Sequence, residues 1–86
     1  GTEFKTSTEH LIEGNNYFKK GDYAKAEVAY RKSLEKDPSN PTAKNNLGVI
    51  LNELGKHDEA IPILKEAISI DNKNAIAHYV LGKALN

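Results

Sequence analysis

Hydrophobic positions recur along this chain at steps of three and four, which is the spacing of amphipathic helices. The pattern is clear from residue 26 to residue 34 and again from residue 47 to residue 54. Gly21 and Gly55 interrupt it, and glycine can adopt the left-handed conformation that ends a helix. The pattern therefore predicts an all-α chain in which helices are paired into hairpins.

Capping residues locate the helix ends. Thr6 followed by Glu9 forms a capping box, in which each side chain bonds the backbone N–H of the other residue. Asparagine and aspartate also cap helices, and proline suits the first helical position after a cap; the chain offers Asp22, Asn40 before Pro41, and Asn74. These signals predict helices over 7–20, 23–36, 41–54, 58–70 and 75–85.

The chain also repeats itself at an offset of 34 residues. Gly14, Gly48 and Gly82 then coincide, and Ala26 coincides with Ala60. We therefore divide the chain into an extension over 1–6, repeat units over 7–40 and 41–74, and a segment over 75–86 that is the first helix of a third unit or a capping helix. Residues 1–4 match what a cloning junction encodes.

Composition narrows the possible partners. Twelve Lys and Arg balance twelve Asp and Glu, so no basic patch is expected to attract nucleic acid or a membrane surface. No apolar run approaches the roughly 20 residues of a membrane span, and no signal peptide is present. The compartment stays unknown, although these features and the absence of cysteine favour a soluble, cytoplasmic protein.

Catalytic and metal-binding motifs are missing. His10, His57 and His78 are far apart, and no pair of them has the helical spacing that would place two metal ligands on one face. The sequence contains no phosphate-binding glycine loop, no nucleophile elbow and no cysteine. We predict neither an enzyme nor a bound cofactor or metal.

The repeated positions resemble the tetratricopeptide repeat (TPR) family. One unit is carried by Gly14, Tyr17, Gly21, Asp22, Tyr23, Ala26, Tyr30, Ser33, Leu34, Asp37 and Pro38. The second is carried by Leu47, Gly48, Leu51, Gly55, Ala60, Leu64, Ala67 and Asp71, and the opening of a third by Leu81, Gly82 and Leu85. The resemblance implies a right-handed α-solenoid of antiparallel helical hairpins, with two complete units and one extra helix.

Three residues depart from the family pattern. Glu13 replaces a large apolar residue, which suits the uncovered face of a first repeat. Asn72 replaces a proline, at the expense of some turn rigidity. Pro62 lies about one turn into the fourth predicted helix and lacks a backbone N–H, so that helix either starts late, near Asp58, or kinks.

The resemblance also implies a binding site, because in this family the first helix of each hairpin lines a concave groove that contacts a peptide. In the first unit the groove residues are Leu11, Ile12, Asn15, Phe18 and Lys19. In the second they are Asn45, Asn46, Val49, Asn52 and Glu53, and in the third Ile76, Tyr79, Val80 and Lys83. Apolar anchors and side-chain amides suit an amphipathic helix or an extended peptide.

One subset of the family clamps the C-terminal carboxylate of chaperone tails with cations and two asparagines. Asn15 and Asn46 match that pattern, but Leu11, Ile76 and Val80 stand where it requires cations. A carboxylate without a cation is poorly compensated for its lost hydration. We therefore predict that this clamp is absent.

The expected function is a scaffold that binds a protein or peptide in the groove, without nucleic acid or membrane. The alternative is self-association, in which the incomplete third unit forms a homo-oligomer or swaps its helix into a second copy. Two and a half repeats fall short of the usual stable array, so a truncated or engineered fragment is also compatible with the pattern.

Overall fold

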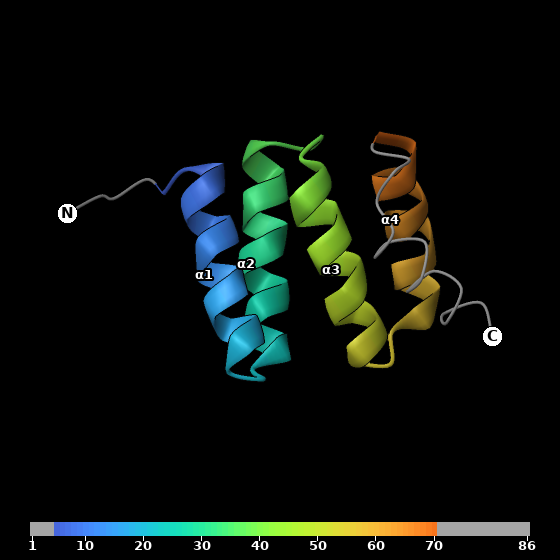
Figure 1. Cartoon of the computed structure of the whole chain (residues 1–86), viewed down its shortest axis with the longest axis horizontal. Helices are drawn as coiled ribbons and strands as arrows, with labels where there is room; N and C mark the ends of the chain where they lie inside the picture. The colour runs from blue at the N-terminus through green and yellow to red at the C-terminus, as the bar shows by residue number, and fades with distance from the viewer. Residues whose placement is uncertain (1–4, 71–86) are drawn as a thin grey trace.

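The computed structural model describes residues 5–70, which form four helices and no strand. They are α1 (Ser7–Lys19), α2 (Tyr23–Lys36), α3 (Pro41–Glu53) and α4 (His57–Ile70). The helices lie side by side in chain order and alternate in direction (Figure 1). α1 packs on α2 and α3 packs on α4, while contacts between α2 and α3 join the two hairpins. The predicted all-α helical-repeat solenoid is confirmed, and the helix predicted over 75–85 lies outside the described residues.

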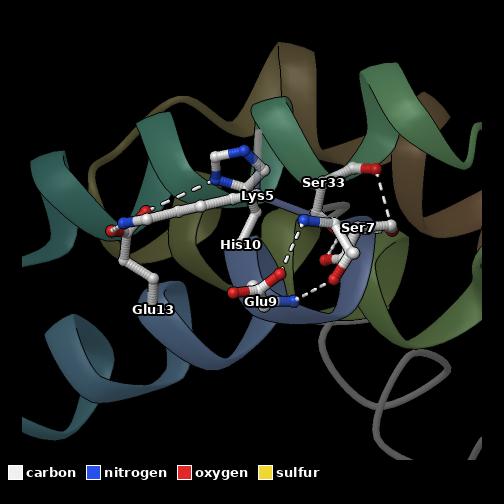
Figure 2. A network of polar contacts seen from close by, with 7 residues as sticks. Lys5, Ser7, Glu9, His10, Glu13 and Ser33 are labelled. Carbon is white, nitrogen blue, oxygen red and sulfur yellow. Dashed lines mark hydrogen bonds and ion pairs between the residues drawn. The ribbon is translucent and has the colours of Figure 1, made fainter. Parts of the chain in front are cut away.

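The ends of the helices follow the predicted caps. Thr6 and Glu9 form the capping box, with the Glu9 N–H donating to Thr6 Oγ1 at 3.1 Å and the Thr6 N–H donating to Glu9 Oε1 at 3.0 Å (Figure 2). Asn40 Oδ1 accepts from the N–H groups of Thr42 and Ala43 at the start of α3. These side chains satisfy amide donors that the first turn of a helix leaves unpaired.

Gly21 and Gly55 make the two hairpin turns possible. Their φ angles are +77° and +79°, in the left-handed region that favours glycine. Each glycine follows a helix whose last turn it closes, with the N–H of Gly21 donating to the Phe18 carbonyl and that of Gly55 to the Asn52 carbonyl. The chain can therefore reverse direction without strain at the same position of both repeat units.

α4 accommodates Pro62 because the helix begins close before it. α4 starts at His57, one residue earlier than predicted, and includes Pro62, which is exposed. The N–H that Pro62 lacks would have bonded the carbonyl of Asp58, in the first turn of the helix. Pro62 therefore removes one backbone hydrogen bond near the exposed start of α4.

The core is made of small and large apolar residues that alternate between the helices. Its buried members are Ala26, Tyr30, Leu47, Ile50, Leu51, Ala60, Leu64 and Ala67. Gly14 lies against the ring of Tyr30, and a Cβ atom at Gly14 would come within 2.6 Å of two ring carbons. Gly48 has the same relation to Leu64. The two glycines therefore let each first helix approach the large side chain of its partner helix.

The outer face of α1 is polar where the matching face of α3 is buried. Ala43, Leu47 and Ile50 are buried in α3, and the residues 34 positions earlier are Glu9, Glu13 and Asn16. Glu13 accepts a hydrogen bond from Lys5 Nζ at 2.5 Å and lies 3.5 Å from His10 Nδ1 (Figure 2). These contacts place Glu13 on a polar face of α1 in the part of the chain that the structure describes.

A network of ion pairs joins α2 of the first hairpin to the α3–α4 turn and α4 of the second. The carboxylate of Glu27 in α2 accepts from Arg31 Nε at 2.9 Å and from Lys56 Nζ, in the α3–α4 turn, at 3.1 Å. Arg31 also donates to Glu59 of α4 at 2.9 Å. Burial alone would raise the pKa of Glu27, but the two hydrogen bonds outweigh it and lower the pKa below its ordinary value of 4.5.

The contact between Gly14 and Tyr30 predicts that Gly14→Ala destabilises the domain. Alanine is the better helix former by about 1 kcal/mol, yet its methyl group would overlap a buried ring that cannot move away, at a cost of about 1–3 kcal/mol. We expect a lower urea midpoint and a lower melting temperature. The control is Asn16→Ala, at an exposed position of the same helix, which should leave stability unchanged or raise it. An increase with Gly14→Ala would contradict the proposed packing.

The Glu27 network predicts a pH-dependent stability difference. Glu27→Gln keeps the shape of the side chain and removes its charge, so the free energy of unfolding at pH 7 should fall by about 0.5–1 kcal/mol. The pKa of Glu27 is lowered in the folded state, so its contribution is present above the unfolded value and disappears as the pH falls through the folded value. The stabilities of the two proteins in urea unfolding should therefore converge as the pH falls through the folded pKa of Glu27, which lies below 4.5. Glu35→Gln, in the same helix but without an ion pair in the described part of the chain, should show no such gap.

Candidate functional site

The ten predicted groove residues that the structure describes all lie on α1 and α3. The five on α1 are Leu11, Ile12, Asn15, Phe18 and Lys19, and the five on α3 are Asn45, Asn46, Val49, Asn52 and Glu53. The other four, Ile76, Tyr79, Val80 and Lys83, lie outside the described residues. The surface formed by these ten residues is called the α1/α3 surface below.

On α1 the predicted residues combine exposed and packed side chains. Ile12 is 54% exposed, and Lys19 is exposed as well. Leu11 and Phe18 are half-buried and pack against the core. The ring of Phe18 stands edge-on to that of Tyr23, with 5.8 Å between centroids and 84° between planes. Phe18 is therefore held in place by the start of α2, while Ile12 is the apolar group of α1 with most surface free for a ligand.

On α3 the predicted residues differ widely in accessibility. Val49 is half-buried against the core, and Glu53 is exposed. Asn52 Oδ1 forms a hydrogen bond with His57 Nδ1. Asn45 is only 7% exposed; its Nδ2 donates to Asn46 Oδ1 at 3.4 Å, and its own Oδ1 is buried without a hydrogen-bond partner in the part of the chain described. Asn45 is therefore the least accessible of the ten.

A cluster of hydrogen bonds connects the two halves of the α1/α3 surface. Asn15 Oδ1 accepts from the Tyr30 hydroxyl at 2.6 Å and from Asn46 Nδ2 at 3.0 Å. The cluster thus joins α1, α2 and α3, and it brings together the two asparagines that the sequence singled out. Tyr30 was named only among the positions that carry the family resemblance, and its contact with Asn15 was not predicted. The two repeats differ at both positions, because Leu64 is equivalent to Tyr30 and Val49 is equivalent to Asn15. A polar pair in one repeat and an apolar pair in the other is the sequence signal for this contact.

Burial controls the chemistry of the Tyr30 hydroxyl. The side chain is fully buried, and burial raises its pKa to about 12, against a smaller opposing effect of the neighbouring Asn46 amide. The hydroxyl therefore keeps its proton throughout the physiological pH range. It acts as a constant hydrogen-bond donor to Asn15.

A concave feature lies between α2, α3 and α4. This cavity has a volume of about 390 Å³ and is lined by Arg31, Leu34, Glu35, Lys44, Leu47 and Ile63. Lys44 Nζ donates to Glu66 at 2.5 Å, and the Lys44 side chain is only 16% exposed. The sequence analysis did not predict this cavity. The sequence signal for the cavity is a polar residue at the same position of both repeats, His10 in the first and Lys44 in the second. Both are largely buried, and His10 is 8% exposed.

The described residues form neither a metal site nor a membrane-spanning helix. Within residues 5–70, no group of three or more histidine, cysteine, aspartate or glutamate side chains is arranged to hold a metal ion. None of the four helices is long and apolar enough to cross a membrane. The α1/α3 surface combines the exposed side chain of Ile12 with a cluster of hydrogen-bonded amides.

Comparison with known proteins agrees with this architecture. The tetratricopeptide repeat family profile matches residues 13–75, and this range covers most of the chain. The chain belongs to the tetratricopeptide repeat family. The resemblance found in the sequence is therefore confirmed.

Individual relatives share the fold over most of this chain. The small glutamine-rich tetratricopeptide repeat-containing protein 2 of Mycosarcoma maydis is 38% identical over 73 residues, which is 85% of this chain and 21% of the relative. Among solved structures, the second TPR domain of Spaghetti (RPAP3), bound to the HSP90 peptide SRMEEVD, is 25% identical with a TM-score of 0.89 over 94% of this chain and 75% of that one.

The TPR2B domain of yeast Sti1, in a complex with pHsp70, is 28% identical with a TM-score of 0.86, and the match covers 91% of this chain and 62% of that one. The chain thus spans about a fifth of the curated relative from Mycosarcoma maydis and about two thirds to three quarters of the two solved domains.

Proposed function

We propose that this chain is a protein-interaction module that binds a peptide or a partner helix on the α1/α3 surface. The observation that carries the proposal is the hydrogen bond between Asn15 and Asn46, which connects predicted residues of two successive repeats. A peptide lying across both helices would contact amide groups at the centre and apolar groups beside them.

The solved relatives support the general role. The second TPR domain of Spaghetti is bound to an HSP90 peptide, and the TPR2B domain of Sti1 is in a complex with pHsp70. Proteins of this family are in general binding modules without catalytic activity. We infer the same role here, with a protein or peptide as the partner and with no reaction carried out.

The chemistry of the surface indicates what kind of peptide it suits. Leu11, Ile12 and Val49 provide apolar contacts, and the amides of Asn15 and Asn46 lie among them. Apolar side chains can anchor an amphipathic helix or an extended peptide, while amides pair with its backbone. We infer an internal peptide segment as the ligand, since a free carboxylate would find apolar Leu11 near the amides instead of a cation.

Ile12→Glu tests the proposed surface. The probe is a short peptide selected from a random library against the wild-type domain and measured by titration calorimetry. A carboxylate on the α1/α3 surface would lose its hydration against an apolar ligand group, so we expect affinity to fall by more than about tenfold. Folding should persist because Ile12 is already exposed.

The matched control is Val28→Glu on α2. Val28 and Ile12 are each 54% exposed, so both changes place a charge on a solvated apolar position. Val28 is two residues from Tyr30, which is about 200° around a helix, so it faces away from the amide cluster. Equal losses in the two variants, no loss with Ile12→Glu, or failure to select any peptide would contradict the proposed function. Val49→Glu should also abolish binding, but Val49 packs against the core and the variant requires a melting control.

The peptide SRMEEVD tests whether a chaperone tail is a ligand. Leu11 cannot compensate a carboxylate, and a hydrogen bond to a charged group contributes about 1.5–3 kcal/mol, so we expect SRMEEVD to bind at least about tenfold more weakly than the selected peptide. Leu11→Lys would supply a cation and should improve binding of SRMEEVD but not of the selected peptide. Tight binding of SRMEEVD by the wild-type domain would show that the prediction of an absent clamp is wrong.

A further inference from the structure

We propose that Tyr30 is a positioning residue that turns Asn15 into a hydrogen-bond donor for the bound peptide. This inference rests on the proposed function, because it concerns the same surface. Its structural origin is Gly14, whose missing side chain allows the ring of Tyr30 to lie directly against α1. The Tyr30 hydroxyl then reaches the next residue of α1 and donates to Asn15 Oδ1 at 2.6 Å.

The chemistry of the amide fixes which of its atoms faces the ligand. An asparagine side chain has an oxygen that only accepts and a nitrogen that only donates. Two donors, the Tyr30 hydroxyl and Asn46 Nδ2, converge on the Asn15 oxygen. Rotating the amide by half a turn would bring its nitrogen against Asn46 Nδ2, so that two donors would face each other. The two donors therefore favour the orientation in which the Asn15 oxygen faces them.

The nitrogen of Asn15 is left for another partner. It lies on the side of the amide opposite to the oxygen, it has no hydrogen-bond partner within residues 5–70, and it is not among the buried unsatisfied atoms. Asn15 itself is half-buried. The amide thus presents two N–H donors that are already oriented, which reduces the entropy lost when a ligand binds.

The second repeat lacks both members of this arrangement. Thirty-four residues after Asn15 and Tyr30 stand Val49 and Leu64. Leu64 is fully buried against Gly48 as Tyr30 is against Gly14, so the packing of the hairpin does not require a hydroxyl. The hydroxyl of Tyr30 occurs in the unit that has an amide to orient, and this agrees with a role in binding rather than in folding.

The ligand group that fits this donor is an acceptor without a full charge. Leu11, one helical turn before Asn15, is apolar; Lys19, one turn after Asn15, is exposed, and no lysine of α1 or α3 forms a hydrogen bond with Asn15 or Asn46 in the described region. A carboxylate would be poorly compensated there. We therefore assign the Asn15 N–H group to a main-chain carbonyl of the bound peptide.

Two variants that change few atoms test the proposal with the selected peptide of the previous section. Tyr30→Phe keeps the ring and removes one of the two hydrogen bonds that hold Asn15 Oδ1, so Asn15 is less firmly oriented and affinity should fall about 3- to 10-fold. Asn15→Asp keeps an oxygen that accepts from Tyr30 and Asn46 but replaces the donor with a second acceptor. Its affinity should fall by more than about tenfold, because acceptor then faces acceptor.

The double variant separates positioning from a merely structural effect. If Tyr30 acts through Asn15, adding Tyr30→Phe to Asn15→Asp should cause almost no further loss, whereas independent effects would multiply. Multiplied losses, or wild-type affinity of Tyr30→Phe, would overturn the proposal. Thermal melts accompany each variant, and each must be folded at the temperature of the titration; if Tyr30→Phe is not, Asn15→Asp alone decides, and its wild-type affinity overturns the proposal.

Two further measurements show whether a negative result contradicts the recognised ligand group, the proposed function or only the role of Tyr30. Amidation of the peptide C-terminus should leave affinity unchanged, and a loss greater than about tenfold would show that a carboxylate, rather than a main-chain carbonyl, is the group recognised. If Ile12→Glu also binds normally, the peptide does not use the α1/α3 surface and the proposed function fails. If Ile12→Glu abolishes binding while Tyr30→Phe does not affect it, the surface is correct and only the role of Tyr30 is refuted.

Discussion

The close approach of each helix pair at a glycine is the constraint on which the rest of the structure depends. Gly14 and Gly48 lie in the middle of α1 and α3, where glycine weakens a helix by roughly 1 kcal/mol relative to alanine. That loss is offset because the missing methyl group lets Tyr30 and Leu64 fill the space between the helices. These two side chains are fully buried and belong to the core that holds both hairpins together.

The same approach determines what the surface can do. Tyr30 fills its space with a ring that ends in a hydroxyl, and the contact at Gly14 carries this hydroxyl to Asn15. A packing requirement and a binding requirement are thus met by one side chain. In the second repeat, Leu64 meets only the packing requirement. Two hairpins with the same backbone therefore offer different chemistry, with an oriented amide in one and an apolar Val49 in the other.

Much of the fold could be predicted from the sequence because its signals are local. Capping by Thr6 and Asn40, and reversal at Gly21 and Gly55, depend on the residues next to them, and all four occur where predicted. The contacts that were missed connect residues distant in sequence. The spacing of charges along α2 gives no reason why Glu27 should meet Lys56, and no periodicity shows that Asn45 is buried whereas Ile12 is exposed. Such contacts depend on how two helices are rotated and offset against each other, and the repeat pattern fixes only that they pack.

The ion pairs and the amide cluster connect the helices through different kinds of interaction. The Glu27 network connects the hairpins through partly exposed charges, whose strength depends on salt and pH. The amide cluster connects α1, α2 and α3 through neutral groups, and burial keeps the Tyr30 hydroxyl protonated far above neutral pH. Changes of salt or pH that weaken the ion pairs therefore leave the hydrogen bonds of the amide cluster in place. A surface organised by neutral donors on a closely packed pair of helices can keep its geometry over a range of ionic conditions in which its charged contacts change.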